Sequence, residues 1–594
     1  MVVPDGGGTT ACSAGGPARL CLGNQEIACN ADGSEAGRRN CPDLGQVCAP
    51  EVGCAVCNPN RSACDGNDVQ RCRADGSGYD VVATCDPSAG QSCNSAVGAC
   101  TNPCEDAAAS NSYIGCEYWP VVTANGVHAE FDFAIVVSNP QTSPATVTVT
   151  RGGSNVATRV VAPGAIESIP LPWVDALKTS TNGSQLVTGG AYRVQSTLPV
   201  TVYQFSPLEY ELPRDCPASP NDTPGDSRCN SFTNDASLLL PTHVLTGNYL
   251  VTAFPTRQNR QSGLGSSQMA STPGFFTVAA AEAGTTTVEI TFASHVLAGT
   301  TGPVTAFAPG STGSFTLQQG DVLQIFSAAP SSCTVGGSDM LDVFTRMEYC
   351  RVGAEYDLTG TQIRASQRVS VLAGHQCAFI PYNRWACDHV EEQLFPEETW
   401  GTDAFVSITE PLRSEPNLIR IVSGRDGNML TFDPPSAHPA RTLNRGEVLE
   451  FEALNSFRVQ GTEAIQVAQF LVGQDYAGIG TSGDGGEGDP SMSLAIPSEQ
   501  FRTSYAFLAP TTYARNWVNV TAPMGATVTL DGTPVAAFAP IGTTGYGVAR
   551  VPVSGGAHQI EGSQPFGIVV YGVGSYTSYM YPGGLDLNEI NIPF

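Results

Sequence analysis

Residues 192–205 read YRVQSTLPVTVYQF, and this pattern returns three more times along the chain. Each copy has an apolar residue, a polar turn with Ser or Gly, and then alternating apolar positions, which is typical of β-strands. The other copies are IRASQRVSVLAGH at 363–375, FRVQGTEAIQVAQF at 457–470 and HQIEGSQPFGIVVYG at 558–572. A strand pattern that recurs in tandem predicts repeated β-units.

Two further pieces of sequence support the repeat. An Asp-containing connector that ends in proline opens three of the units, as NDASLLLP at 234–241, CDHVEEQLFP at 387–396 and GDPSMSLAIP at 488–497. LQQGDVLQIF at 317–326 and LNRGEVLEFEA at 443–453 predict Gly-centred hairpins. No segment has a convincing 3.6-residue apolar period, so the fold class predicted is all-β, with tandem β-sandwich-like repeat units.

The front of the chain differs, because 14 of the 20 cysteines precede residue 117. Twelve of them form two copies of one six-cysteine spacing, at 12, 21, 29, 41, 48 and 54 and at 57, 64, 72, 85, 93 and 100. Little apolar sequence separates them, which predicts two small disulfide-rich modules whose connectivity the spacing leaves open. Disulfides persist in oxidising surroundings, so we expect a secreted or surface-tethered protein.

The six later cysteines predict three local disulfides, Cys216 with Cys229, Cys333 with Cys350, and Cys377 with Cys387. The predicted organisation is a flexible leader at 1–11, Cys-rich modules at 12–56 and 57–103, a hinge at 104–117, and β-units at 118–235, 236–393, 394–493 and 494–594.

The net charge of -27 disfavours a nucleic-acid partner, and no apolar run reaches the roughly 20 residues that span a bilayer. Met1 leads into a polar, Gly-rich stretch instead of a signal peptide. Since so many cysteines require export, we expect a signal that was removed or that lies upstream of the given start. A lipid anchor upstream would be compatible with this leader.

The chain lacks the short motifs of common enzymes, including G-x-S-x-G, H-E-x-x-H and phosphate-binding loops. We therefore expect no catalytic residues and no enzyme. The alternative is a hydrolase whose site assembles from distant residues.

Three constellations are candidate sites. The run 388–398 contains Asp388, His389, Glu391, Glu392, Glu397 and Glu398, which could ligate a metal, but we interpret it as a solvated acidic connector. Asp484, Glu487 and Asp489 lie in a Gly-rich loop and form a weak candidate Ca²⁺ site. Because the loop lacks EF-hand spacing, we favour a plain loop without a bound ion. Apart from this candidate, we expect no cofactor. Arg193, Arg364 and Arg458 recur at one position of the repeat and either contact a partner or, as we favour, pair within their own units.

The β-region resembles the IgGFc-binding protein N-terminal domain family. The fragments that carry the resemblance are YRVQSTLPVTVYQF, NDASLLLPTHVLTGNYLV, the run from Gly374 to Gly401, and the run from Val467 to Val520. The Cys-rich front is similar to repeats that begin secreted bacterial proteins. The resemblance implies binding or adhesion, not catalysis, and supplies no ligand and no binding residues.

These observations predict a secreted or cell-surface binding protein that presents a rigid β-array to a glycoprotein, glycan or cell-surface partner. The alternative is a structural subunit of an extracellular coat or fibre, in which units associate head to tail.

Overall fold

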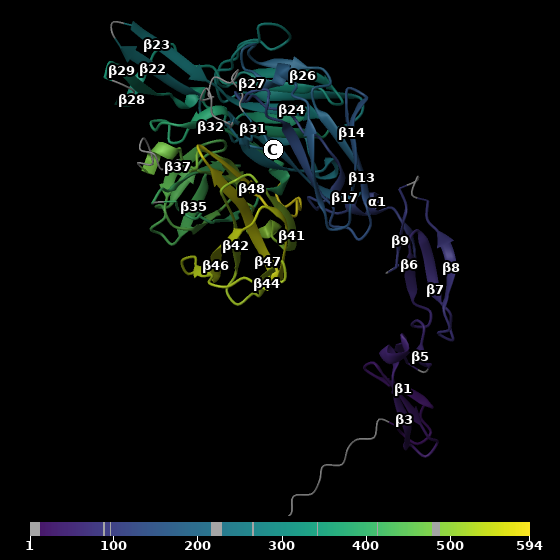
Figure 1. The fold of residues 1–594 in the computed structure, drawn as a ribbon. Helices are drawn as coiled ribbons and strands as arrows, with labels where there is room; N and C mark the ends of the chain where they lie inside the picture. Colours follow the sequence, from purple (N-terminus) through teal and green to yellow (C-terminus); the bar gives the residue numbers. More distant parts are fainter. Residues whose placement is uncertain are drawn as a thin grey trace, which may run out of the picture. The chain divides into compact units, whose positions relative to one another are not determined.

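The computed structural model describes residues 12–593 except 51, 87–89, 96, 215–228, 264–265, 341–342, 413 and 478–486. The chain forms two compact units, Met1–Asp106 and Ala107–Phe594 (Figure 1). The prediction of an all-β chain of tandem sandwiches behind disulfide-rich modules is confirmed.

The first unit contains two modules with the same disulfide connectivity. In each module the first cysteine bonds the third, the second bonds the fifth, and the fourth bonds the sixth. The bonds are Cys12–Cys29, Cys21–Cys48, Cys41–Cys54, Cys57–Cys72, Cys64–Cys93 and Cys85–Cys100. The strands are β1 (Arg19–Leu22), β2 (Gln25–Cys29), β3 (Glu35–Asn40), β4 (Val47–Ala49), β5 (Gly53–Ala55), β6 (Ser62–Asp65), β7 (Asp68–Cys72), β8 (Tyr79–Thr84), β9 (Ser92–Asn94) and β10 (Ala99–Thr101), with the short helix η1 (Cys41–Leu44) in the first module. Few apolar side chains are buried here, so the disulfides supply much of the stability.

The second unit opens with the end of helix α1 (Pro103–Ala108), which lies in the predicted hinge, and then forms four β-sandwiches. The first sandwich contains β11 (Gly115–Tyr118), β12 (Phe133–Ser138), β13 (Ala145–Arg151), β14 (Ser154–Val161), β15 (Ile166–Leu171), β17 (Tyr192–Ser206) and β20 (Asp235–Leu239). The second contains β21 (Asn248–Leu250), β24 (Gly274–Ala280), β25 (Thr285–Thr291), β26 (Thr312–Gln318), β27 (Val322–Phe326), β30 (Gln362–Ala365), β31 (Val369–Phe379) and β32 (Cys387–Gln393), and β16 (Gln185–Val187) adds to its edge.

The third and fourth sandwiches follow the same plan. The third contains β33 (Asp403–Val406), β34 (Asn417–Ser423), β35 (Asn428–Asp433), β36 (Arg441–Leu443), β37 (Val448–Ala453), β38 (Phe457–Gly461), β39 (Ile465–Phe470) and β40 (Met492–Leu494). The fourth contains β41 (Arg502–Ala509), β42 (Arg515–Pro523), β43 (Val528–Leu530), β44 (Thr533–Pro534), β45 (Ala539–Pro540), β46 (Tyr546–Val553), β47 (Gly556–Gly574) and β48 (Thr577–Pro582). Short elements between them are α2 (Asp175–Lys178), β18 (Glu211–Leu212), β19 (Cys229–Asn230), η3 (Thr242–Val244), η4 (Ala354–Tyr356), η5 (Glu397–Thr399), η6 (Gln474–Ala477) and η7 (Ser498–Gln500).

The repeated turn-strand pattern is the place where the chain crosses between the two sheets of a sandwich. Residues 192–196 of β17 pair with β13 in one sheet, and residues 201–206 pair with β12 and β20 in the other. β47 crosses in the same way, whereas the second and third sandwiches use two strands each, β30 then β31 and β38 then β39. The polar residues between the two apolar stretches lie at this crossing, which explains why the pattern recurs.

The two predicted Gly-centred hairpins are wrong. β26 pairs with β25, while β27 pairs with β24 and β16 in the opposite sheet, and β36 and β37 are separated in the same way. Gly320 and Gly446 have φ of 82° and 75°, so each permits a tight turn between sheets instead of within one.

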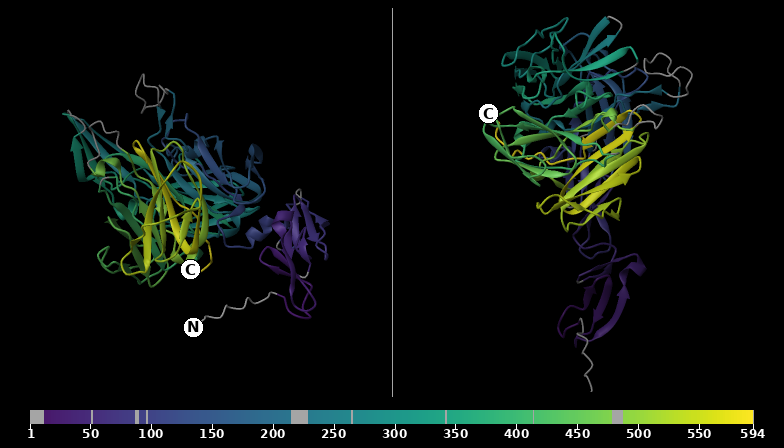
Figure 2. Two further views of the ribbon diagram at one scale, coloured as in Figure 1. Left: turned by 60° about the horizontal axis from the view of Figure 1, so that its bottom comes forward. Right: turned by 90° about the vertical axis from the view of Figure 1, so that its left-hand side faces the viewer.

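The four sandwiches close into a ring around their last strands. β20 lies against β32 and β48, and β40 lies against the same two strands. In both views of Figure 2 the yellow fourth sandwich lies beside the green third and the blue first. The Tyr203 hydroxyl donates to the Ala506 carbonyl at 2.9 Å, and one continuous apolar core runs through all four sandwiches.

The predicted boundary at residue 235 differs from the strand arrangement. β20 begins at Asp235 and runs across that boundary to Leu239, and it pairs with β17 of the first sandwich. Each sandwich therefore ends with a central strand, and in three cases the next begins after a proline and a short helix, η3, η5 or η7.

A four-stranded arm extends the second sandwich. Its order is β23 (Ser266–Thr272), β22 (Arg257–Gly263), β29 (Thr345–Arg351) and β28 (Thr334–Met340). Figure 1 shows this arm standing out from the sandwiches.

Candidate functional site

Polar side chains gather where the four central strands meet. Asp388, His389, Glu391 and Glu392 of β32 are fully buried, and so is Glu397 in η5. The interpretation of this run as a solvated acidic connector is therefore wrong. β32 is buried on both faces because it lies between sandwiches, and an acidic strand in that position cannot face water.

Asp235 holds the central strands together. Its Oδ2 accepts the backbone N–H groups of Glu391 and Met492, each at 3.0 Å, and its Oδ1 accepts those of Ala236 at 2.9 Å and Met580 at 3.3 Å. These donors belong to β20, β32, β40 and β48, one from each sandwich. Burial raises the pKa of Asp235 well above its usual range, and the N–H donors oppose that rise.

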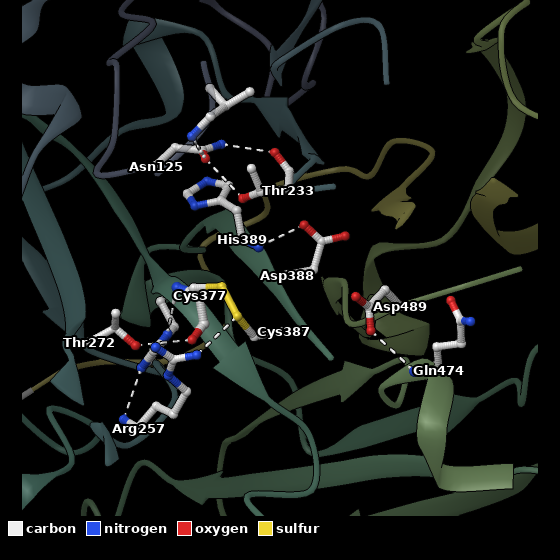
Figure 3. Close-up of a disulfide and its surroundings, with 12 residues drawn as sticks. Asn125, Thr233, Arg257, Thr272, Cys377, Cys387, Asp388, His389, Gln474 and Asp489 are labelled. Carbon is white, nitrogen blue, oxygen red and sulfur yellow. Dashed lines mark hydrogen bonds between the residues drawn. A yellow bond between two sulfur atoms is a disulfide. The ribbon is translucent and has the colours of Figure 1, made fainter. Parts of the chain in front are cut away.

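Two further carboxyl groups face this junction (Figure 3). Asp388 Oδ1 accepts the backbone N–H groups of Asn234 at 2.6 Å and His389 at 2.7 Å. Burial, and then the charge of Asp489, raise the pKa of Asp388 well above its usual range. Burial likewise raises the pKa of Asp489, whose Oδ1 accepts the Gln474 N–H at 3.1 Å.

His389, Glu391 and Thr123 lie close together, as the groups of a hydrolase would. His389 Nε2 is 3.2 Å from Glu391 Oε2 and 3.3 Å from Thr123 Oγ1. A relay needs the acid and the nucleophile on opposite ring nitrogens, but both contact Nε2 here. All three side chains are also fully buried, so this cluster does not act as a catalytic triad.

The three residues of the candidate calcium site differ in their surroundings. Asp484 lies outside the described residues, Glu487 pairs with Arg515, and Asp489 is buried beside Gln474. Glu487 and Asp489 line one small cavity of about 30 Å³. Within the described ranges, the one group of three acid, Cys or His ligands close enough to share an ion is Glu26, Cys41 and Cys54, whose cysteines are disulfide-bonded.

Calcium binding stays a prediction. If the loop holds Ca²⁺, removal of the ion with EDTA lowers the melting temperature by several degrees, because a ligand that binds the folded state stabilises it. Thermal unfolding with EDTA and with added Ca²⁺ checks this, and identical curves would remove the ion from consideration.

The recurring arginines pair locally in two sandwiches. Arg193 Nε lies 2.6 Å from Glu117 Oε1, and Arg458 Nε lies 2.7 Å from Asp403 Oδ1. Arg364 is exposed and has no ion pair within the part of the chain that the structure describes. The three arginines therefore do not form one shared surface for a partner.

The later cysteines are also paired. The structure contains Cys333–Cys350 and Cys377–Cys387. Cys229 is disulfide-bonded, whereas Cys216 lies outside the described residues.

The arm carries the most exposed apolar side chains of the second sandwich. Val343 is 84% exposed, Phe344 64% and Met340 59%, and all three lie at or near the tip between β28 and β29. β23 and β28 are edge strands, so their outer backbone groups face away from the sheet. Exposed apolar side chains beside open strand edges are typical of protein interaction sites.

Comparison with known proteins shows the family. Residues 235–572 match the model of the family described as IgGFc binding protein. The chain belongs to this family. The match begins at Asp235, the residue that joins the central strands, and includes the arm. The human IgGFc-binding protein is 33% identical over 117 residues, which cover 20% of this chain. They cover only 2% of that relative, so the chain spans a small part of its length.

Family membership and the disulfides indicate an extracellular binding protein. None of the helices in the described ranges is long and apolar enough to cross a membrane. Sequence reasoning missed the arm tip. The clue was the length of the second unit together with the apolar Val343 and Phe344 between Cys333 and Cys350.

Proposed function

We propose that the chain is a secreted or cell-surface adhesion protein whose arm contacts a glycoprotein partner. The observation that carries the proposal is the exposed apolar tip at Met340, Val343 and Phe344, held away from the sandwiches on a disulfide-braced sheet. The ring and the continuous core give this arm a rigid support. A bacterial origin, suggested by the Cys-rich front, belongs to the same proposal.

The ring favours adhesion over a coat or fibre built by joining sandwiches head to tail. The first and fourth sandwiches already pack on each other through Tyr203 and Tyr581, whose rings lie 4.8 Å apart. The surfaces that such a chain of sandwiches would use are therefore occupied within one molecule.

The tip variant Phe344→Ser is expected to weaken binding to a mucin-type glycoprotein or to cells about tenfold or more. Apolar anchors at the centre of an interface each contribute on the order of 1–2 kcal/mol or more. Biolayer interferometry on glycoprotein-coated sensors measures the change. Leu454→Ser is the matched control, because Leu454 is 62% exposed on the third sandwich.

Equal losses in the two variants would contradict a role for the arm. Binding no stronger than that of an unrelated acidic protein of matched charge would remove the adhesion proposal itself. The family name points to the Fc part of immunoglobulin G as a probe, and an Fc-coated sensor tests whether that partner extends to this chain.

A further inference from the structure

A pocket of about 270 Å³ lies at the base of the arm. Arg257 begins β22 and Arg351 ends β29, and the register of these strands places Gln258 opposite Cys350, so the two arginines are neighbours across the strands. Both line the pocket, together with Phe379 and Tyr382 from the end of β31 and the turn after it.

Arg257 is a cation without a carboxylate partner among the described residues. Its Nη1 lies 3.1 Å from Cys387 Sγ, its guanidinium lies 4.7 Å from the centre of the Phe379 ring, and its Nε is buried without a hydrogen bond. Burial lowers the pKa of Arg257 to about 10. Figure 3 shows its side chain directed at the Cys377–Cys387 disulfide. A sulfur atom is a weak acceptor and leaves the positive charge uncompensated.

Arg351 adds a second cation on the open side. Its Nε donates to the Tyr382 hydroxyl at 3.1 Å, and its guanidinium lies 5.7 Å from the centre of that ring. Gly336 of β28 allows this arrangement, since a Cβ there would lie 2.2 Å from the Tyr382 hydroxyl. The one acid that lines the pocket, Glu450, lies 3.1 Å from Arg420 Nε, and it shares that guanidinium with Asp357.

Two arginines against one carboxylate leave the lining of the pocket net positive, in a chain whose net charge is -27. Guanidinium groups bind carboxylates and sulfates through paired, charge-assisted hydrogen bonds. The partly exposed ring of Tyr382 beside them offers flat apolar surface, whereas Phe379 is buried against Arg257. The volume lies just below the range of pockets for drug-sized ligands. A ligand with one ring and one acidic group fits this chemistry and volume better than an extended oligomer does.

We propose that this pocket binds the acidic group of one sugar residue, with Arg257 and Arg351 holding a carboxylate or sulfate and Tyr382 packing against the sugar ring. The proposal rests on the proposed function, because it names the part of a glycoprotein that the protein recognises. The arm tip would then contact the polypeptide while the pocket at its base holds an acidic sugar.

Titration of the full chain with free sugars tests the pocket without a macromolecular partner. The probes are glucuronic acid, N-acetylneuraminic acid, glucose 6-sulfate and uncharged glucose, measured by calorimetry or ligand-observed NMR at up to about 10 mM. We expect at least one acidic sugar to bind and glucose not to bind, and the carboxylate and sulfate probes show which anion is preferred.

Arg351→Gln is expected to weaken that binding about tenfold or more. Arg351 is exposed, so this variant is expected to fold, and Arg257→Gln serves as the second variant. Arg346→Gln is the matched control, since Arg346 is an exposed arginine on the same strand but outside the pocket. It is expected to leave sugar binding unchanged.

Equal binding of glucose and the acidic sugars, no binding of any acidic sugar, or equal effects of Arg351→Gln and Arg346→Gln would each overturn the proposal. Glycoprotein binding that persists in Arg351→Gln but disappears in Phe344→Ser would overturn the pocket and leave the adhesion function intact.

Discussion

Asp235→Ala is expected to remove most of the stability of the four-sandwich unit. The substitution leaves the backbone N–H groups of Ala236, Glu391, Met492 and Met580 without their acceptor, and all four residues lie in buried strands. Each buried donor left unpaired costs about 1–3 kcal/mol, so the loss for four donors is roughly 4–12 kcal/mol. Folded domains have about 5–15 kcal/mol in total, which makes this loss severe.

Urea unfolding followed by tryptophan fluorescence measures the effect. All 5 tryptophans lie beyond residue 106, so the signal reports on the sandwiches and not on the cysteine modules. Asp235→Asn keeps one acceptor oxygen and is expected to lose less than Asp235→Ala, so it gives a measurable value if the alanine variant fails to fold. Asp175→Ala, at an exposed aspartate of α2, is the control.

An alanine variant that unfolds at the same urea concentration as the parent would show that the central strands do not depend on Asp235. Equal losses in Asp235→Ala and Asp175→Ala would lead to the same conclusion. If the four hydrogen bonds stabilise the centre, stability decreases in the order parent, Asp235→Asn, Asp235→Ala.

Much of the fold could be predicted because the repeat is local. The turn-strand pattern around residues 192–205 marks a sheet crossing, and the prolines at 241, 396 and 497 mark the start of three sandwiches. Both features depend on residues close in sequence. The duplicated cysteine spacing predicted two modules for the same reason.

The ring and its centre could not be predicted, because they depend on contacts between distant residues. Glu391 and Asp235 meet across 156 positions, and Met580 and Asp235 across 345. An acidic run read alone indicates a solvated connector, since most such runs face water. The aspartate in each connector indicated that the three segments occupy equivalent places in their sandwiches. The sequence did not show that these places are buried.

The pH dependence of stability tests the electrostatics of the centre. Burial raises the pKa of Asp388, Asp489 and Glu392 well above the usual range, and for Asp388 the charge of Asp489 adds to the effect. A carboxyl with a raised pKa keeps a proton in the folded state that the unfolded chain releases. Its stabilising effect is complete below about pH 4 and is lost as the pH rises through the raised value. We therefore expect a higher melting temperature at pH 5 than at pH 8.

The expected slope is up to about 1.4 kcal/mol per pH unit for each such group. A net charge of -27 produces a trend of the same sign, because acid also relieves repulsion among surface carboxylates. Asp489→Asn separates the two causes, since asparagine imitates the protonated acid and is expected to raise stability at pH 8 and flatten the pH profile. Glu487→Gln removes one charge two residues away, from a group in an ion pair at the surface, and is expected to leave the profile steep.

Melting curves recorded from pH 5 to 8 give the stability profile of each variant. EDTA in the buffer removes any bound calcium, so that it does not contribute to the result. Parallel curves for Asp489→Asn and Glu487→Gln would show that Asp489 makes no contribution to the pH dependence. A flat curve for Asp489→Asn alone would place the titrating proton between Asp388 and Asp489, where the strands of different sandwiches meet. The centre would then be a junction whose strength increases as the surroundings become acidic, because a shared proton removes the repulsion between two buried carboxylates.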